Sequence, residues 1–361
     1  MTKKELVALR SEIERIDSEI LESLARRIEV SREIGLTKAK DGVNIKDLAR
    51  EKTVRANFAR DAKRLGIAPQ SAVRIANLLI SDSVSVQKQK VAGGLRGKNA
   101  LVIGGAGRMG EWTCRFLSNR GAEVRVWDER GKLPGYENLK SPNKFAATSQ
   151  IVVLAGPIGR TPSDLKLVID SSPRGVVFDL CSVKSHIATE LTSACRRGLL
   201  VTSVHPMFGP NAPSPEGRNV VVCDCGSKKA NRFAELLFSS AGADVSLISL
   251  EKHDELMAYI LGLSHLCTLL FSRTIIVSGK SLVELNDASG PSFEKLIKMA
   301  SELSNESKRV YHDIQFLNPH AKRVISEMGK VLKDLERASL SENPAAFGKM
   351  MESSRQLQEV R

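Results

Sequence analysis

The hydrophobic and polar positions along the chain form three successive patterns, and the first of them is helical. In residues 4–40, apolar side chains recur three or four positions apart, as on one face of a long helix. Asp41 and Gly42 end this helix, and two more helices are predicted over residues 45–65 and 69–90. Three helices without a strand leave much of so long a helix uncovered, which indicates that this part of the chain pairs with a second copy.

The second pattern consists of short runs rich in Val and Ile, which are typical of buried parallel strands. Glycine-containing turns and helical stretches separate these runs, including a predicted helix over residues 228–241. This alternation predicts a doubly wound, Rossmann-type α/β domain. The predicted strands are residues 101–103, 123–127, 151–154, 176–179, 199–204, 220–222 and 245–248.

The third pattern is helical again and continues from residue 250 onward. Residues 259–277 are apolar on nearly all sides, which predicts a buried core helix or a dimer helix. Later helices are predicted over residues 281–288, 292–314, 319–338 and 343–358. The predicted fold class is therefore multidomain: an all-α three-helix domain (1–90), a glycine-rich linker (91–98), a Rossmann-type α/β domain (99–249) and an all-α helical domain (250–361).

A glycine-rich turn, residues 105–110, follows the first predicted strand with the spacing Gly-x-Gly-x-x-Gly. In dinucleotide-binding loops these glycines permit a tight turn, a close approach to pyrophosphate and close helix packing. Asp128 follows about 20 residues later, where a carboxylate holds the ribose hydroxyls of NAD. We therefore expect NAD, with NADP as the alternative because Arg130 is close, rather than a domain that has lost its ligand. The predicted cofactor-binding residues are Gly105, Gly107, Arg108, Met109, Gly110 and Asp128.

The composition is that of a soluble globular protein and narrows its partners. Hydrophobic residues make up 42% of the chain and charged residues 26%, and no run approaches the ~18 apolar residues of a membrane span. The net charge of +13 is spread along the chain and only 4% of residues are aromatic, which favours a small anionic substrate over nucleic acid. The six cysteines form no CxxC pair, so no metal is expected, and reduced thiols indicate the cytoplasm.

Polar residues recur at fixed spacing on the first three helices. Arg10 and Arg27 are 17 residues apart, about 25 Å along one helix, so no small ligand bridges them within one chain. Two antiparallel copies would bring Arg10 of one beside Arg27 of the other, and Lys38 returns to the face of Arg27. The alternative is that these residues are ordinary solvated charges. The remaining members of the set, which share helix faces, are Asp47, Arg50, Glu51, Ser83 and Gln87.

Residues 1–90 resemble the all-helical chorismate mutase family, because all eight of these polar residues match its active-site set. The resemblance implies an intertwined dimer in which Arg10 reaches the partner's site. It also implies the rearrangement of chorismate to prephenate, which needs a compact conformer and stabilised charge rather than a nucleophile. The arginines would grip the substrate carboxylates, and Lys38 and Gln87 would donate to the ether oxygen. Glu51 and Asp47 would receive the ring hydroxyl and position the cations.

Residues 98–340 resemble the prephenate dehydrogenase family. Besides the glycine-rich turn, the matching stretches are Asp-Leu-Cys-Ser-Val-Lys at 179–184, His-Pro-Met-Phe-Gly-Pro at 205–210 and Glu-Lys-His-Asp at 251–254. The resemblance implies that His205 is the catalytic base, that Ser182 orients it and that His265 lines the substrate pocket. For His265, a core histidine is the alternative. The product of the first family is the substrate of the second, so the two resemblances support one bifunctional enzyme of tyrosine biosynthesis.

One position departs from the dehydrogenase pattern. Many bacterial relatives carry an arginine for the ring carboxylate where this chain has Glu294, and Lys295 is the expected substitute, with Lys298 or Arg273 as alternatives. An arogenate-preferring dehydrogenase therefore stays open. A non-catalytic NAD-binding sensor is the rival from another class, and the presence of His205, Ser182 and the eight mutase residues argues against it.

Overall fold

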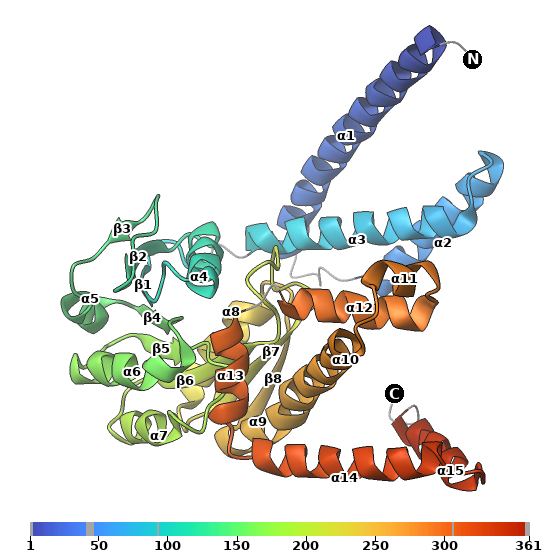
Figure 1. The fold of residues 1–361 in the computed structure, drawn as a ribbon. Coiled ribbons are helices and arrows are strands. Elements are labelled where there is room, and N and C mark those ends of the chain that lie inside the picture. The colour runs from blue at the N-terminus through green and yellow to red at the C-terminus, as the bar shows by residue number, and fades with distance from the viewer. Residues whose placement is uncertain (1–2, 41–46, 92–93, 305–306, 358–361) are drawn as a thin grey trace.

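The protein, seen in a computed structural model that describes residues 3–40, 47–91, 94–304 and 307–357, has two helical parts joined by a sheet (Figure 1). The first part contains α1 (Lys3–Lys40), α2 (Leu48–Arg64) and α3 (Pro69–Val91), in agreement with the helical periodicity of the sequence. Both α1 and α2 pack against α3. The predicted start of the second helix falls in residues 41–46, which lie outside the described residues, and its described N-terminus is capped by Asp47.

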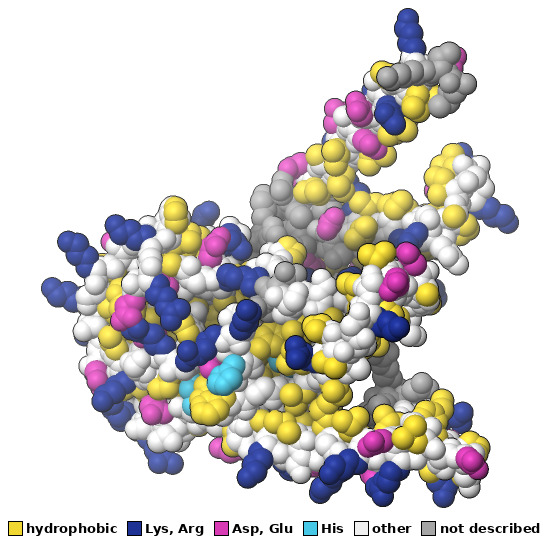
Figure 2. Space-filling view, viewed as in Figure 1, with side chains coloured by type: hydrophobic (Ala, Val, Ile, Leu, Met, Phe, Trp, Pro, Cys, Tyr) yellow, Lys and Arg dark blue, Asp and Glu magenta, His cyan; other side chains and the backbone are white. Residues whose placement is uncertain are grey.

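The first helix is far longer than the surface that its neighbours cover. Figure 1 shows α1 extending away from the sheet, and Figure 2 shows apolar side chains gathered along it. Ile13 is 58% exposed and Leu21 is 65% exposed. The predicted pairing with a second copy would cover these apolar side chains.

The central part is an eight-stranded sheet with the order β3-β2-β1-β4-β5-β6-β7-β8, and neighbouring strands are parallel except for β6 and β7. The order reverses between β1 and β4, which is where doubly wound sheets open a crevice for a nucleotide. The strands are β1 (Asn99–Ile103), β2 (Glu123–Trp127), β3 (Glu137–Asn138), β4 (Ile151–Leu154), β5 (Val176–Asp179), β6 (Val201–Pro206), β7 (Asn219–Asp224) and β8 (Asp244–Ser249).

Helices cover both faces of this sheet, which explains why its central strands read as continuous apolar runs. On one face α4 contributes Phe116 and α8 contributes Phe238, whose ring contacts both Phe116 and Phe178 of β5. On the other face α5, α6 and α7 contribute Ala146, Leu165 and Leu191 to a second apolar cluster. The helices are α4 (Arg108–Asn119), α5 (Asn143–Thr148), α6 (Thr161–Asp170), α7 (Ala188–Arg196) and α8 (Lys228–Ser239).

After the last strand the chain is helical. The prediction of one helix over residues 292–314 is wrong, because α12 ends at Ser304 and Ser307 caps a new helix by accepting a hydrogen bond from the backbone N–H of Val310. The helices are α9 (Leu250–Met257), α10 (Ser264–Ser278), α11 (Leu282–Asp287), α12 (Pro291–Ser304), α13 (Lys308–Phe316), α14 (Ala321–Ser339) and α15 (Ala345–Ser353).

A wider, π-helical turn (Ala258–Leu263) joins α9 to α10, so residues 250–278 form one continuous helical run. By length and composition this run is apolar enough to cross a membrane, since an 18-residue window of it has a mean hydropathy of 1.7. The sequence predicted a buried core helix or a dimer helix here. The C-terminal half is not buried within this chain, since Val277 is 75% exposed, so the buried-core alternative is wrong for that half.

Candidate active sites

The helical N-terminal part brings Arg27 and Ser83 together across α1 and α3. Nη1 of Arg27 donates to Ser83 Oγ and, over 2.6 Å, to the backbone oxygen of Leu79. Ser31 Oγ lies 3.0 Å from Ser83 Oγ and completes the contact. Burial lowers the pKa of Arg27, but a guanidinium stays charged at neutral pH, so this half-buried cation is available to an anion.

The other residues predicted for this site are spread over the three helices. The carboxylate of Asp47 accepts from the backbone N–H of Arg50 over 2.9 Å and so caps α2. Glu51 accepts from Arg55 over 3.1 Å, and Arg55 in turn donates to Asn77 on α3. Arg10 and Arg50 are exposed and Lys38 is half-buried. The side chain of Gln87 lies outside the described residues.

The glycine-rich turn closes tightly on the neighbouring strand end. Gly104, one residue earlier than predicted, takes the left-handed backbone conformation (φ +79°), and a Cβ there would lie 2.5 Å from the backbone of Gly156. A Cβ on Gly105 would lie 2.6 Å from Val126, and one on Gly110 would lie 2.1 Å from the oxygen of Gly104. Gly105 and Gly110 therefore serve close packing, whereas Gly104 and Gly107 also line the cavity beside the turn.

A cavity of about 1190 Å³ opens beside this turn. Its walls include Gly107, Arg108, Met109 and Asp128 from the nucleotide half and Ser182, His205 and His265 from the other half. Gly107 caps α4 without a side chain, so the first N–H groups of α4 can meet phosphate oxygens. The cavity thus fits a dinucleotide beside a second small molecule.

Asp128 lies at the end of β2 with its carboxylate already placed. One oxygen accepts from the backbone N–H of Ala106 over 3.1 Å and the other accepts from that of Arg130 over 2.8 Å. A carboxylate has further lone pairs, which ribose hydroxyls can use. An ion pair between Glu129 and Arg160, with Arg160 lying over the Trp127 ring, closes the same side of the cavity.

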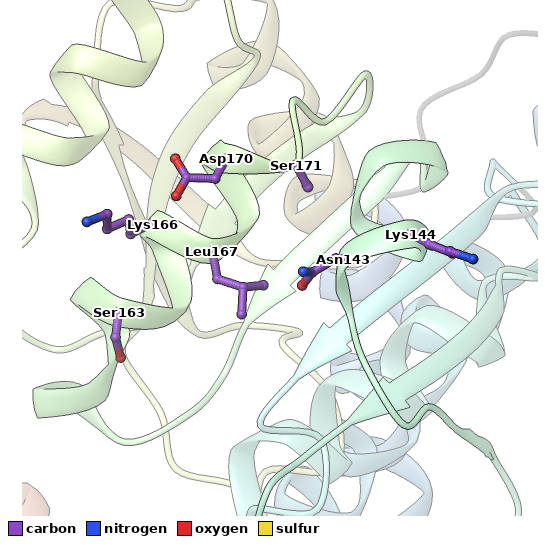
Figure 3. Close-up of a pocket in the computed structure, with 7 residues that line it drawn as sticks. All are labelled: Asn143, Lys144, Ser163, Lys166, Leu167, Asp170 and Ser171. Atoms are coloured by element: carbon purple, nitrogen blue, oxygen red, sulfur yellow. The ribbon is translucent and has the colours of Figure 1, made fainter.

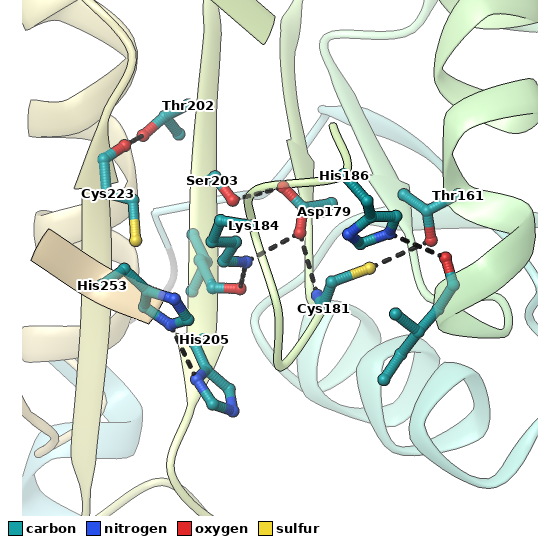
Figure 4. Close-up of polar contacts among 12 residues, drawn as sticks. Thr161, Asp179, Cys181, Lys184, His186, Thr202, Ser203, His205, Cys223 and His253 are labelled. Carbon is teal, nitrogen blue, oxygen red and sulfur yellow. Dashed lines mark hydrogen bonds and ion pairs between the residues drawn. The ribbon is translucent and has the colours of Figure 1, made fainter. Parts of the chain in front are cut away.

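His205, the penultimate residue of β6, meets a second histidine that the sequence analysis did not assign a role. Nδ1 of His205 lies 3.0 Å from Nε2 of His253 on α9 (Figure 4). Nδ1 of His253 lies 2.7 Å from the carboxylate of Asp254. Ser182 was predicted to orient His205. The contact with Nδ1 of His205 is made by His253 instead, and Ser182 lines the cavity.

A buried ion pair stands behind these histidines. Nζ of Lys184 lies 2.7 Å from Asp179, at the end of β5, and 2.9 Å from the backbone oxygen of Val204. Both charged side chains are fully buried. Ser203 Oγ donates to the second oxygen of Asp179, so the pair also joins β5 to β6 beside His205 (Figure 4).

The electrostatics keep both histidines neutral at neutral pH. Burial, together with the positive charge of Lys184, lowers the pKa of His205 well below 6.5. Burial also lowers the pKa of His253. Burial acts in the opposite direction on Asp254, but hydrogen bonds from His253 and Ser185 lower its pKa to about 2, so its carboxylate is ionised.

The helical part supplies the far wall of the cavity. His265 stacks on Tyr311 with ring centroids 4.0 Å apart, and burial lowers the pKa of His265 to about 4. Arg309 also lines the cavity, and its Nε donates to both carboxylate oxygens of Asp313 over 3.1 Å. Lys295, the expected carboxylate anchor, is exposed on α12 and is not among the residues that line the cavity.

A second cavity, of about 630 Å³, lies between α5 and α6 (Figure 3). Its two lysines, Lys144 and Lys166, point away from one another, so they do not converge on a ligand. Among the described residues, no group of His, Cys, Asp and Glu could hold a metal ion. The described cysteines are all free thiols, and burial raises the pKa of Cys181 and Cys223 to about 12.

Known families match both parts of the chain. Residues 9–88 match the family described as chorismate mutase type II. Residues 134–247 match the nucleotide-binding domain of prephenate dehydrogenase. A T-protein from Enterobacter agglomerans is 25% identical over 352 residues, which are 96% of this chain and 92% of the relative. The likeness therefore covers both parts in the same order.

Solved structures share the fold of the sheet and the helices that follow it. Prephenate dehydrogenase from A. aeolicus, solved with hydroxyphenyl propionate and NAD+, is 19% identical with a TM-score of 0.60, covering 74% of this chain and 99% of that chain. Synechocystis arogenate dehydrogenase is 16% identical with a TM-score of 0.54, covering 73% of this chain and 100% of that chain.

The position of Asp128 predicts a preference for NAD over NADP. Its carboxylate is held beside the glycine-rich turn, where it can accept from ribose hydroxyls and would repel a 2′-phosphate. We expect the dissociation constant for NAD to be the lower, and Asp128→Ala to weaken NAD binding by about tenfold, the size of one charge-assisted contact. Titration with each dinucleotide measures this, with Asp244→Ala, an exposed carboxylate on β8, as the control. Tighter binding of NADP by the unaltered chain would contradict the assignment.

Proposed function

We propose that the chain, a bifunctional chorismate mutase and prephenate dehydrogenase, catalyses two consecutive steps of tyrosine biosynthesis. The N-terminal helices rearrange chorismate to prephenate. The sheet and the helices after it convert prephenate to 4-hydroxyphenylpyruvate with hydride transfer to NAD. The observation that carries the second step is that a buried neutral histidine, His205, lines the same cavity as the glycine-rich turn. The domain borders 1–90, 99–249 and 250–361 are part of this proposal.

The mutase step needs cations rather than a nucleophile. The rearrangement is intramolecular, so the site has to hold chorismate in its compact conformer and stabilise the separating charge. Arg27 is suited to a substrate carboxylate because its guanidinium is half-buried and fixed by Ser83 and the Leu79 carbonyl. Lys38 and Gln87 are assigned to the ether oxygen, and Glu51 and Asp47 to the ring hydroxyl and the positioning of cations.

The dehydrogenase step needs a base beside the ring of prephenate. NAD, when bound, supplies the acceptor for the hydride that leaves C4. His205 takes the proton of the C4 hydroxyl as that carbon becomes carbonyl-like, and the loss of CO2 then gives the aromatic ring. A neutral imidazole suits this task, and burial of His205 keeps water from competing for the proton. Ser182 and His265 line the cavity around the substrate.

We assign the ring carboxylate of prephenate to Arg309. It is the arginine on the first turn of α13, the helix that forms the far wall of the cavity. Nη2 of Arg309 lies beside Gly159, since a Cβ built on that glycine would be 3.6 Å from Nη2. The guanidinium therefore reaches the loop after β4. Nε is engaged by Asp313, which fixes the plane of the guanidinium and directs the Nη groups to a substrate anion. Arg309 thus takes the role that Glu294 cannot fill.

A homodimer is part of the proposed function. Arg10 and Arg27 lie on one continuous helix, so Arg10 can only complete the mutase site of a second copy. Apolar side chains also gather over α10 and α14 (Figure 2), where Ile276 and Val331 are exposed in the single chain. A second copy would cover both surfaces. We place this biosynthetic enzyme in the cytoplasm, consistent with its free cysteines.

Arg27→Ala should separate the two activities. A charge-assisted contact to a carboxylate is worth about 1.5–3 kcal/mol, so the mutase rate should fall at least about tenfold while prephenate oxidation is nearly unchanged. Both are measured on the full chain, by loss of chorismate and by NADH absorbance. The control is Arg26→Ala, which removes the neighbouring exposed arginine and should spare both rates. A matching fall in both activities would show that the sites are not separate.

His205→Asn should remove the base while keeping a polar side chain. Loss of a general base costs about 10²–10⁴ in rate, so we expect at least a hundredfold fall in dehydrogenase kcat, with NAD affinity and mutase activity intact. The unaltered enzyme should keep its rate from neutral pH down to 6.5 and lose it only below, because the pKa of His205 lies well below 6.5. His312→Asn, on an exposed histidine, is the control. A kcat within tenfold of wild type for His205→Asn would refute the mechanism.

Arg309→Ala should raise the KM for prephenate and leave kcat nearly unchanged, because the carboxylate contact binds the ground state and the transition state alike. One charged contact at a partly solvated site predicts about a tenfold rise. Lys295→Ala is the matched control, since it removes a cation of the same helical part outside the cavity. If Lys295→Ala raises KM and Arg309→Ala does not, the ring carboxylate binds at α12 instead.

A further inference from the structure

We propose that His253 and Asp254 are positioning residues that fix the tautomer of His205, so that Nε2 is the basic nitrogen offered to the substrate. The three side chains form one buried row, from Asp254 through His253 to His205 (Figure 4 shows the two histidines). The inference deepens the proposed dehydrogenase function and rests on it. It identifies which ring nitrogen acts and which residues determine that choice.

The argument begins at the ionised carboxylate of Asp254, which can only accept hydrogen bonds. Nδ1 of His253, 2.7 Å away, must therefore carry the hydrogen. A neutral imidazole has one N–H, so Nε2 of His253 is left with its lone pair. That lone pair accepts from Nδ1 of His205 over 3.0 Å, which places the hydrogen of His205 on Nδ1. Nε2 of His205 is then the unprotonated nitrogen, in a side chain that lines the cavity.

The carboxylate of Asp254 is held firmly enough to determine which ring nitrogens of the two histidines carry the hydrogens. One oxygen accepts from the backbone N–H of Lys184 over 2.9 Å, and the other accepts from the backbone N–H and the hydroxyl of Ser185 over 2.7 and 2.5 Å. On the opposite side, Asn318 donates to the backbone oxygen of Asp254 over 2.8 Å. Rigid anchoring matters because general-base catalysis depends on holding the acceptor nitrogen within hydrogen-bond reach of the proton.

This placement of the hydrogens also requires His253 to stay neutral. A protonated His253 would donate hydrogen bonds from both of its ring nitrogens. Nδ1 of His205 would then have to accept, so the hydrogen of His205 would be on Nε2, and Nε2 could not act as the base. Burial disfavours the protonated form of His253, and the fully buried positive charge of Lys184 also disfavours a second cation nearby. The buried lysine therefore has a function in the site beyond its ion pair with Asp179.

Asp254→Asn is the sharpest test. The oxygen of the new amide can keep the contacts to Ser185 and the longer contact, 3.1 Å, to the backbone N–H of Lys184. Its NH2 group then faces His253 and must donate to Nδ1. The tautomers of both histidines then reverse, and Nε2 of His205 carries a hydrogen. In serine proteases the equivalent exchange costs about 10⁴ in kcat with the geometry intact, and here we expect a loss of at least a hundredfold. The KM for prephenate and the dissociation constant for NAD should change by less than about threefold, as expected when an interaction made only in the transition state is lost.

Variants of His253 separate positioning from packing. In His253→Gln the amide oxygen can replace Nε2 as the acceptor, whereas His253→Leu fills similar space and accepts nothing. We expect Gln to retain kcat within about tenfold and Leu to lose at least a hundredfold, within the range for a general base. A role in packing alone would lower NAD affinity and thermal stability in both variants and would give no rescue by Gln.

The outcomes are distinguishable. Glu255→Gln, which makes the same change at the next residue on an exposed side chain, should leave kcat unchanged. If Asp254→Asn and His253→Leu keep kcat within threefold while His205→Asn loses it, the positioning role is refuted and the proposed function stands. If His205→Asn is itself active, the proposed base is wrong and the positioning role fails with it.

Discussion

The contact of Asp254 with the backbone of Lys184 and Ser185 is the constraint on which the dehydrogenase site depends. It joins the first helix after the sheet, α9, to the loop that follows β5. A carboxylate buried in this way is stable only when its oxygens are satisfied, and here two backbone N–H groups, a hydroxyl and an imidazole satisfy them. The helical part cannot shift relative to the sheet without breaking these bonds. The two halves of the cavity therefore keep a fixed spacing between the nucleotide loop and the substrate wall.

Part of the apolar surface of the single chain is not covered by other parts of the chain. The core of the sheet is closed on both faces, whereas α1 and the end of α10 expose large aliphatic side chains. Exposed apolar surface is unfavourable in water. Burying it against a second copy would stabilise the pair by about 25 cal/mol per Å² of apolar surface. The same pairing that covers α1 would supply Arg10 to the mutase site. Stability and activity of the first domain would then depend on one interface.

The sequence predicted the parts of the fold that depend on local pattern. The bounds of β2, β4 and β5 agree with the predicted strands. β4 and the first three residues of β5 are buried and continuously apolar, whereas β2 alternates buried Val124 and Val126 with more exposed residues, which is the pattern of a strand covered on one face. His205 was found because the stretch His-Pro-Met-Phe-Gly-Pro at 205–210 resembles the dehydrogenase family. The role of His253 could not be predicted in the same way, since it depends on a contact with a residue 48 positions away. The break between α12 and α13 was missed because Leu303 and Val310 are seven residues apart, about two helical turns, so the apolar face keeps its phase across the polar residues between them. The capping by Ser307 marks the new helix.

Charge balance explains how a base can act while fully enclosed. Two buried carboxylates, Asp179 and Asp254, and one buried ammonium group, Lys184, give the resting cluster a net charge of minus one. Moving a proton from the substrate to His205 brings the cluster to zero rather than adding an isolated charge, so burial does not forbid the transfer. In the resting state the nearby ammonium group opposes protonation and keeps the lone pair available. When the proton arrives, the carboxylate of Asp254 can stabilise the new imidazolium through His253. The same buried charges that hold the resting base neutral thus also make its protonated form tolerable during turnover.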